Sequence, residues 1–293
     1  MNISLITYDG LPELDPDDCL FKDELVKRGH KVSACIWDDE SIDWSKFDVS
    51  IMRSAWDYHL KKDQFYAWMD KVSRQSKLLN PPALMKWSSH KTYLKELGLA
   101  NLPVVETLWV EKGGRANGLF DELHWQKAIV KPAVGLATFG VKKIALRQGD
   151  NPSPAGIKEA ENHANQLAES EDVMIQPFLA SVDDYGERAL IFLNGQYSHT
   201  IRKTSFQHLA PGGHAGETSV ATDAEEVAVA QQVIDYLAER PLYARVDLVR
   251  DSAAKPLVLE LELVEPSLFL AFHPPAAVGF ADALESVLNL HKV

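Results

Sequence analysis

Short apolar runs alternate with amphipathic segments over the first 80 residues of the chain. Three runs have the length of strands, and two longer segments carry apolar residues at helical spacing. The first of these two segments stops before Gly29. The strands are expected at 2–7, 31–37 and 47–52, and the helices at 18–28 and 63–74. Another short strand should precede Asn80. This alternation predicts an α/β domain with a parallel sheet and helices on its faces.

The pattern changes after residue 87. A helix capped by Ser88 or Ser89 is expected to run through Leu97 and to stop at Gly98. A second helix should end near Ser170. Three strands are expected between the two helices, at 102–110, 128–132 and 140–145.

The last part of the chain predicts an antiparallel sheet with a helix. Asn194-Gly195 separates two apolar runs, which is a strong signal for a two-residue hairpin. A helix is expected at 223–239, followed by a second hairpin with strands at 243–249 and 256–264. We therefore divide the chain into a parallel α/β domain at 1–87 and two α+β parts at 88–171 and 172–293.

Charge and composition narrow the functional classes. The 293 residues include 30 Lys and Arg against 42 Asp and Glu, a net charge of −12 that disfavours nucleic acid and anionic membranes as partners. The uncharged stretch 266–281 is too short to span a bilayer. The chain has two cysteines and no leader-like start, which predicts a cytoplasmic protein. The first turn lacks GxGxxG, so a dinucleotide is not expected there.

The second hairpin carries the most informative side chains. If it is symmetric about its loop, Asp247 lies opposite Glu260 and Arg245 opposite Glu262. When three carboxylates lie so close to one another, they repel unless a cation binds between them. Carboxylate oxygens are hard ligands, which Mg²⁺ prefers. The alternative is a solvated strand face on which Arg245 pairs with an acid. The opposite, apolar face is expected to consist of Ala244, Val246, Leu248, Leu257, Leu259, Leu261 and Leu263.

Two further segments suit nucleotide binding. Lys131 ends an apolar strand before a small-residue loop that includes Thr138, and backbone N–H groups of such a loop can enclose a phosphate. The alternative is an ordinary surface lysine. The segment Gln176-Pro177-Phe178-Leu179 runs from a strand into an extended linker that can present backbone polar groups to a purine, although a core strand edge has the same pattern.

Two other segments suit a substrate. Arg53 and Ser54 follow the third strand, where ligands of parallel sheets bind, and Arg53 can hold a carboxylate by bidentate contact. A glycine loop containing Gly212, Gly213 and His214 is the second candidate. The alternative for the segment after the third strand is a solvated loop with one buried Trp. The oligomeric state stays open, a homo-oligomer included.

From residue 80 onward, these features resemble the ATP-grasp superfamily in their order and spacing. The glycine loop after Lys203 makes the glutathione synthetase and ribosomal-protein glutamate ligase branch the most similar. The phrases Arg53-Ser54-Ala55-Trp56-Asp57-Tyr58 and Glu262-Leu263-Val264-Glu265-Pro266-Ser267-Leu268 also resemble the ATP-grasp cyclo-ligases that form cycloserine. The resemblance implies a two-subdomain α+β ATP-grasp fold after the α/β domain.

The resemblance also implies roles for individual residues. Lys91, placed on the helix, and Lys131 would hold ATP phosphates, and Glu187 would reach the ribose. The segment 176–179 would line the adenine. The metal ligands would be Asp247, Glu260 and Glu262. Glu262 stands where the family commonly has Asn, so the number of bound Mg²⁺ ions, one or two, stays open.

Arg245 departs from the small residue of glutathione synthetases, and its charge could hold a transferred phosphoryl group. Arg202 or Lys203 could share that work, and spacing does not decide between them. The implied reaction is ATP- and Mg²⁺-dependent ligation of a carboxylate to an amine through an acyl phosphate, which needs no protein nucleophile. The implied partner is a small amino-acid-like or peptide-like substrate. An intramolecular cyclo-ligase and a non-catalytic nucleotide-binding protein are the alternatives.

Overall fold

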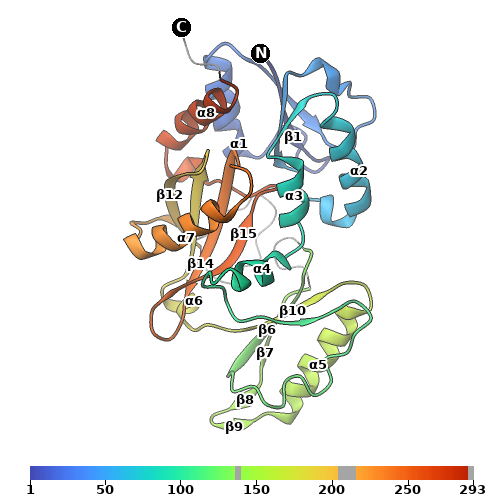
Figure 1. The fold of residues 1–293 in the computed structure, drawn as a ribbon, viewed down its shortest axis with the longest axis vertical. Helices are drawn as coiled ribbons and strands as arrows, with labels where there is room; N and C mark the ends of the chain where they lie inside the picture. The colour runs from blue at the N-terminus through green and yellow to red at the C-terminus, as the bar shows by residue number, and fades with distance from the viewer. Residues whose placement is uncertain (136–139, 204–215, 290–293) are drawn as a thin grey trace.

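The computed structural model describes residues 1–135, 140–203 and 216–289 (Figure 1). Its N-terminal part confirms the predicted parallel sheet, whose strands follow the order β2-β1-β3-β4. Side chains from both faces of this sheet are buried. The elements are β1 (Asn2–Thr7), α1 (Pro16–Lys27), β2 (Lys31–Ile36), η1 (Trp44–Lys46), β3 (Val49–Ser54), η2 (Tyr58–Leu60), α2 (Lys62–Val72) and β4 (Lys77–Leu79).

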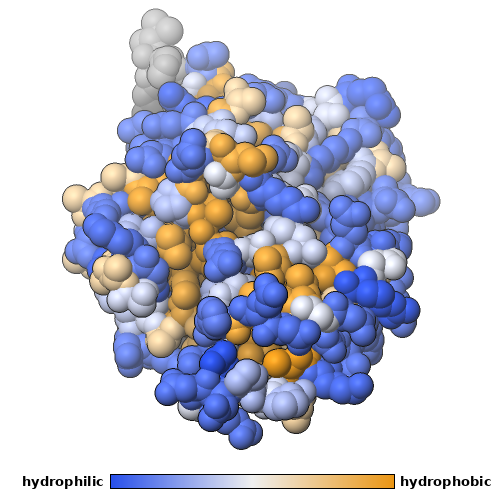
Figure 2. Space-filling view, turned by 60° about the horizontal axis from the view of Figure 1, so that its bottom comes forward, coloured by the Kyte–Doolittle hydropathy of each residue, from blue (hydrophilic) through white to orange (hydrophobic). Residues whose placement is uncertain are grey.

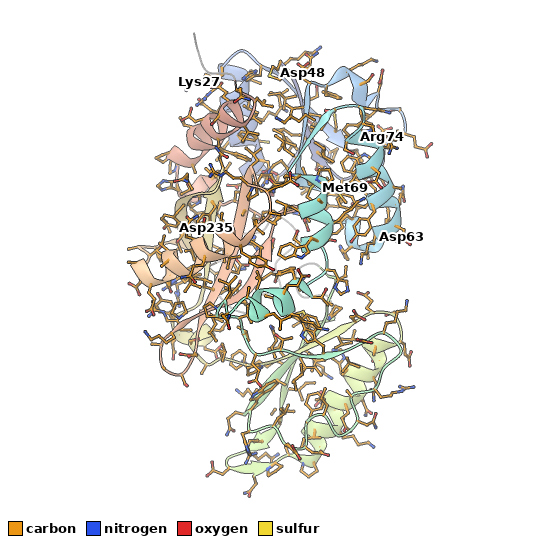
Figure 3. The ribbon with its side chains drawn as sticks, viewed as in Figure 1. Lys27, Asp48, Asp63, Met69, Arg74 and Asp235 are labelled. Carbon is orange, nitrogen blue, oxygen red and sulfur yellow. The ribbon has the colours of Figure 1, made fainter. Side chains whose placement is uncertain are left out.

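Local sequence signals set the ends and faces of these helices. The side chain of Asp15 accepts a hydrogen bond from the backbone N–H of Asp17 at the start of α1, and Gly29 adopts a φ of 86° just after its end. On α2, Met69 is fully buried, whereas Asp63 and Arg74 near its two ends are exposed (Figure 3). The predicted amphipathic pattern therefore describes this helix correctly.

The single helix expected from Ser88 or Ser89 through Leu97 is wrong. Two helices stand there, α3 (Pro82–Ser88) and α4 (Tyr93–Leu99). Lys91 lies in the turn between them, because its backbone N–H donates to the carbonyl of Ala133 at 2.9 Å instead of continuing a helix. Gly98 lies inside α4, which ends one residue after it.

The middle part is an antiparallel sheet of order β5-β10-β6-β7 with α5 packed against it. The strand expected at 102–110 is reduced to its last three residues. The elements are β5 (Leu108–Val110), β6 (Lys127–Pro132), β7 (Lys142–Ala145), β8 (Arg147–Gln148), β9 (Asn151–Pro152), α5 (Pro154–Ala168) and β10 (Val173–Pro177).

The last part is an antiparallel sheet of order β13-β12-β11-β14-β15, as the two hairpins predict. Asn194 and Gly195 have φ values of 47° and 74°, the positive pair that this tight turn requires. The elements are α6 (Ser181–Asp184), β11 (Glu187–Leu193), β12 (Gln196–Lys203), β13 (Thr218–Ser219), α7 (Ala224–Tyr236), β14 (Tyr243–Arg250), β15 (Pro256–Glu262), η3 (Leu270–Phe272) and α8 (Pro275–Val287).

The C-terminal helix α8 packs against the N-terminal part, which the sequence pattern did not indicate. The rings of Phe21 on α1 and Phe280 on α8 stack with centroids 3.8 Å apart. One hydrophobic cluster contains residues of β1, α1, β11 and α8 together. The parallel sheet and the five-stranded sheet therefore share a core, and Figure 1 shows α8 beside α1 at the same end of the molecule.

Two further observations concern the surface and the thiols. No helix in the described ranges is long and apolar enough to cross a bilayer. Cys19 and Cys35 are both free thiols. Figure 2 shows apolar residues gathered in a band across the middle of one face, with hydrophilic residues around it.

Candidate active site

The β14–β15 hairpin has the predicted register at the charged positions. Arg245 pairs with Glu262 and Asp247 with Glu260. A β-bulge follows Asp247, because Leu248 pairs with Val258. The expected apolar face is therefore wrong at two positions. Leu257 and Leu259 are half-buried, whereas Pro256, Val258 and Leu261 of β15 are buried, as is Leu263 just after the strand.

Arg245 and Lys203 converge on Asp247. The guanidinium of Arg245 donates to both carboxylate oxygens of Asp247, at 2.9 and 3.0 Å, and also pairs with Glu262. The Lys203 Nζ lies 2.7 Å from Asp247 Oδ2 and pairs with Glu187 as well. Burial would raise the pKa of Asp247, but the two cations outweigh burial and hold this pKa below its usual range.

Lys91 holds the remaining predicted metal ligand. Its Nζ lies 3.0 Å from Glu260 Oε1 and 3.1 Å from the carbonyl oxygen of Gly135. Burial opposes the charge of Lys91, yet Glu260 keeps the lysine pKa above its ordinary value. Lys91 thus joins the loop after β6 to the edge strand β15.

Two carboxylates at the centre of the site have raised pKa values, because burial and neighbouring acids disfavour their charged forms. Burial, with Glu260 and Asp247 nearby, raises the pKa of Glu262 to about 7 despite Arg245. Burial also raises the pKa of Glu187 above its usual range, against the effect of Lys203. An added cation would relieve this repulsion.

The predicted Mg²⁺ ligands fit the ion by donor type. Asp247, Glu260 and Glu262 bring hard carboxylate oxygens to one face of one hairpin, as Mg²⁺ prefers. Each of them is turned to a cationic side chain here, and the described residues form no group of three acids, histidines or cysteines arranged around an ion site. Metal binding would require Lys203, Arg245 or Lys91 to give up part of these contacts.

The segment 176–179 lies where β10 ends. Gln176 is buried, and its amide donates to the Thr107 hydroxyl at 2.9 Å. Pro177 and Leu179 are half-buried. The Nζ of Lys143 lies 3.3 Å from the centroid of the Phe178 ring, so a cation covers one face of this ring.

Arg202 and Lys203 point to different partners because successive side chains of a strand alternate between its faces. Arg202 donates to the carbonyl oxygens of Tyr185 at 2.9 Å and Asp184 at 2.8 Å. Of these two candidates, only Lys203 reaches the acids of the hairpin.

Arg53 and Ser54 lie in the interior. Arg53 is 1% exposed and donates to Asp18 at 2.7 Å and to the Pro266 carbonyl at 2.9 Å, while Ser54 donates to the other oxygen of Asp18 at 2.9 Å. The guanidinium lies over the Tyr243 ring at 4.6 Å. Both side chains thus connect α1 with the segment after β15, and their predicted contact with a substrate carboxylate stays a prediction.

Four other candidate residues fall outside the described ranges: Thr138, Gly212, Gly213 and His214.

Sequence reasoning missed three residues around the hairpin. The side chain of Asn80 forms four hydrogen bonds, with the backbone of Leu242, Tyr243 and Leu263. The hydroxyl of Tyr93 accepts from the backbone N–H of Leu261 at 2.8 Å. Glu265, just after the hairpin, is buried, and its place between two apolar runs is the sequence signal for a buried acid.

Comparisons with known proteins bear on the whole chain. Residues 3–80 match the family model of the N-terminal domain of D-cycloserine synthetase DcsG. The cycloserine biosynthesis protein DcsG of Streptomyces lavendulae is 33% identical over 278 residues, which cover 89% of this chain and 90% of that protein. The crystal structure of D-cycloserine synthetase DcsG superposes with a TM-score of 0.86 at 29% identity and covers 98% of this chain and 100% of that one.

More distant structures share the fold. A RimK domain ATP-grasp protein from Sphaerobacter thermophilus has a TM-score of 0.68 at 15% identity and covers 97% of this chain and 99% of its own. A D-alanine–D-alanine ligase from Bacillus anthracis, complexed with ATP, has a TM-score of 0.66 at 15% identity, with 99% and 96% covered. The predicted ATP-grasp architecture is thereby confirmed.

Proposed function

Because the chain belongs to the DcsG family of ATP-grasp ligases, we propose that it uses ATP and Mg²⁺ to activate a carboxylate of an amino-acid-like or peptide-like substrate for attack by an amine. As a member of this family, the chain is a ligase that forms carbon–nitrogen bonds with the use of ATP. The cofactors, the acyl phosphate and the residue roles are the proposal.

The observation that supports it best is the charged face of the hairpin. Asp247 and Glu260 stand opposite each other, Arg245 and Glu262 are the next pair, and Lys91 and Lys203 approach from two other parts of the chain. A binding-only site has little use for so many buried charges, because each must be desolvated. A site that stabilises phosphoryl transfer needs them.

The residues have distinct proposed tasks. Lys91, Lys131 and Lys203 would contact the phosphates of ATP, and Asp247, Glu260 and Glu262 would hold Mg²⁺, which supplies positive charge beside the phosphates. Arg245 would donate hydrogen bonds to the transferred phosphoryl group. The segment 176–179 would line the adenine and Glu187 would bind the ribose.

Cyclisation is the variant of this reaction that the comparisons favour, because the relative with 33% identity is a cycloserine biosynthesis protein. In that variant, the activated carboxylate and the attacking amine belong to one molecule. The product of this chain's reaction would then be a ring closed by the new carbon–nitrogen bond.

A product assay tests both levels. The full chain is incubated with ATP, Mg²⁺ and pools of amino acids and their derivatives, and ADP and products are measured. ADP release that needs one organic substrate supports cyclisation, and a strict need for two supports ligation between molecules. Absence of ADP and phosphate with every pool would contradict the proposed reaction and favour a nucleotide-binding protein.

A further inference from the structure

The turn between α6 and β11 connects two candidate contacts of the nucleotide. The segment 176–179, which is proposed to line the adenine, leads toward α6. Glu187, which is proposed to bind the ribose, is the first residue of β11. Residues 180–186 lie between the two contacts, so the position of the Glu187 side chain depends on how this turn is held.

Arg202 holds the end of this turn from the neighbouring strand β12. Its Nε donates to the carbonyl oxygen of Tyr185 at 2.9 Å, and its Nη2 donates to that of Asp184 at 2.8 Å. Asp184 is the last residue of α6 and Tyr185 follows it, at the end where a helix leaves its carbonyl oxygens without helical partners. Because a guanidinium carries its donors in a rigid fork, it can bind both carbonyls at once.

Gly186 makes room for Arg202 and turns the chain into β11. Its φ is 81°, a left-handed conformation that favours glycine. A Cβ at this position would lie 2.8 Å from Nε of Arg202, 2.9 Å from Cγ of Arg202 and 2.9 Å from the carbonyl oxygen of Lys203. The turn and the guanidinium therefore fit closely together, and a larger residue at position 186 would push them apart.

The side chain of Tyr185 fixes the same turn. The guanidinium carbon of Arg188 lies 3.8 Å from the centroid of the Tyr185 ring, and that of Arg250 lies 4.2 Å from it. The Tyr185 hydroxyl donates to Oε1 of Glu226 on α7 at 2.9 Å. Tyr185 is thus held through its ring, its hydroxyl and its backbone carbonyl, two positions before Glu187.

Arg202 and Glu187 belong to opposite faces of the five-stranded sheet. In the register of β11 and β12, Glu187 pairs with Lys203 and Arg188 pairs with Arg202. Successive side chains of a strand alternate between the faces. Glu187 and Lys203 therefore share the face of the site, where they form an ion pair, and Arg202 lies on the other face. Arg202 can act on the site through the backbone of the turn that it holds.

We propose that Arg202 is a positioning residue for Glu187 and thereby sets the selectivity of the protein for a nucleotide that carries ribose hydroxyls. By holding the carbonyl groups of Asp184 and Tyr185, Arg202 fixes the direction in which the chain enters β11. The place of the Glu187 carboxylate follows from that direction. This assignment rests on the proposed function, in which Glu187 binds the ribose, and it gives Arg202 a task other than phosphoryl transfer.

Two nucleotides that differ only in the sugar hydroxyls test the assignment. ADP and 2′,3′-dideoxy-ADP are titrated into the full chain with Mg²⁺, and calorimetry gives the two affinities. The wild type should bind ADP about 10-fold to 100-fold more tightly, as expected for hydrogen bonds to a charged group. Arg202→Ala should reduce this preference to about 3-fold or less and leave the affinity for dideoxy-ADP within about 3-fold of wild type. Arg202→Lys keeps a donor for one carbonyl and should give an intermediate preference.

A double-mutant cycle and a control variant separate positioning from a general effect on the fold. Glu187→Gln should lose the preference for ADP, and adding Arg202→Ala to it should change the preference no further, because both substitutions act on one contact. Arg240→Ala is the matched control, since the Arg240 side chain lies beside Gly195 at the other end of the β11–β12 hairpin. This variant should keep the wild-type preference.

The outcomes distinguish this assignment from the proposed function. A preference that is lost in Glu187→Gln but survives in Arg202→Ala would overturn the positioning role alone, and a loss of turnover in that Arg202 variant would then point to phosphoryl transfer. Equal affinity of the wild type for the two nucleotides would overturn the ribose contact of Glu187 and the positioning role with it. Failure of the ligase reaction itself would show separately, as the absence of ADP release in the product assay.

Discussion

The two strands of the charged hairpin are held in different ways. β14 lies inside the five-stranded sheet and pairs with β11 on one side and β15 on the other. β15 is the edge strand, and its outer side is bound by residues from the first half of the chain. Figure 1 shows α4 beside β15. These bonds join Asn80 to Leu263, Tyr93 to Leu261, and Pro103 and Val105 to Val258.

This difference explains how the site is assembled. Arg245 and Asp247 occupy fixed positions because the sheet holds their strand on both sides. Glu260 and Glu262 depend on contacts with residues 80–105, which also supply Lys91. An edge strand without such contacts would leave its backbone groups unpaired. The sheet of the second half of the chain therefore positions β14 by itself, whereas β15 also needs contacts with the first half of the chain.

The largest contrast should come from removing one acid on each strand. Asp247→Asn should abolish turnover and lower the free energy of unfolding by about 3 to 5 kcal/mol, because it neutralises a buried carboxylate that Arg245 and Lys203 share. Glu260→Gln should also lose turnover, but it should cost only about 1 kcal/mol, since its side chain is 22% exposed. ADP release and urea unfolding measure the two effects.

The exposed pair of Glu225 with Lys255 provides the control. Glu225→Gln should change the free energy of unfolding by less than about 0.5 kcal/mol. Equal stability losses for Asp247→Asn and Glu260→Gln would contradict the difference between the strands.

Asn80→Ala tests the clamp at the end of the hairpin, by which we mean the four hydrogen bonds of the Asn80 side chain. The substitution removes four buried hydrogen bonds and leaves backbone groups of both strands without partners, so the free energy of unfolding should fall by about 3 kcal/mol. Asn80→Asp keeps the accepting oxygen and serves as the matched variant. A loss below about 1 kcal/mol in urea unfolding of Asn80→Ala would show that β15 is held without this clamp.

The segment after β15 should be pH-sensitive. His199 on β12 contacts the Leu268 carbonyl through Nε2 at 3.0 Å, and burial together with His273 lowers the pKa of His199 to about 4. The unfolded chain, with a histidine pKa of about 6.5, binds this proton first as pH falls. The contribution of His199 to the free energy of unfolding is therefore fully present above pH 6.5, and about 2 to 3 kcal/mol of it is lost by pH 4.

Urea unfolding between pH 7 and pH 4 measures this effect. Other groups titrate in the same range, so the informative quantity is the difference between wild type and His199→Gln. The variant should lose less stability than the wild type as pH falls. Parallel pH profiles of the two proteins would rule out the lowered histidine pKa.

A smaller effect than those of Asn80→Ala and the His199 titration is expected from the loss of one bond to the outer side of β15. Tyr93→Phe removes the hydroxyl that accepts from the Leu261 N–H and should lower the free energy of unfolding by about 1 to 2 kcal/mol. Because Leu261 lies between Glu260 and Glu262, the variant should also need a higher Mg²⁺ concentration for half-maximal turnover. An unchanged Mg²⁺ dependence would indicate that the sheet alone positions the two acids.

The sequence determined most of the elements and the pairing within the hairpin. The strands of the parallel sheet, the turn at Asn194-Gly195 and the opposition of Asp247 and Glu260 all follow from local alternation and turn chemistry. These signals involve residues close to one another along the chain. The helix expected from Ser88 or Ser89 failed because a tertiary bond from Lys91 to Ala133 overrides the local capping signal.

Only the tertiary structure decided which charges meet. Three features depend on segments far apart in sequence: the interior position of Arg53, the contacts of Arg202 away from the acids, and the attachment of α8 to α1. Spacing along one strand assigns a side chain to a face but does not determine what packs against that face. Burial and long-range ion pairing fix these partners, and both exist only once the sheets share a core.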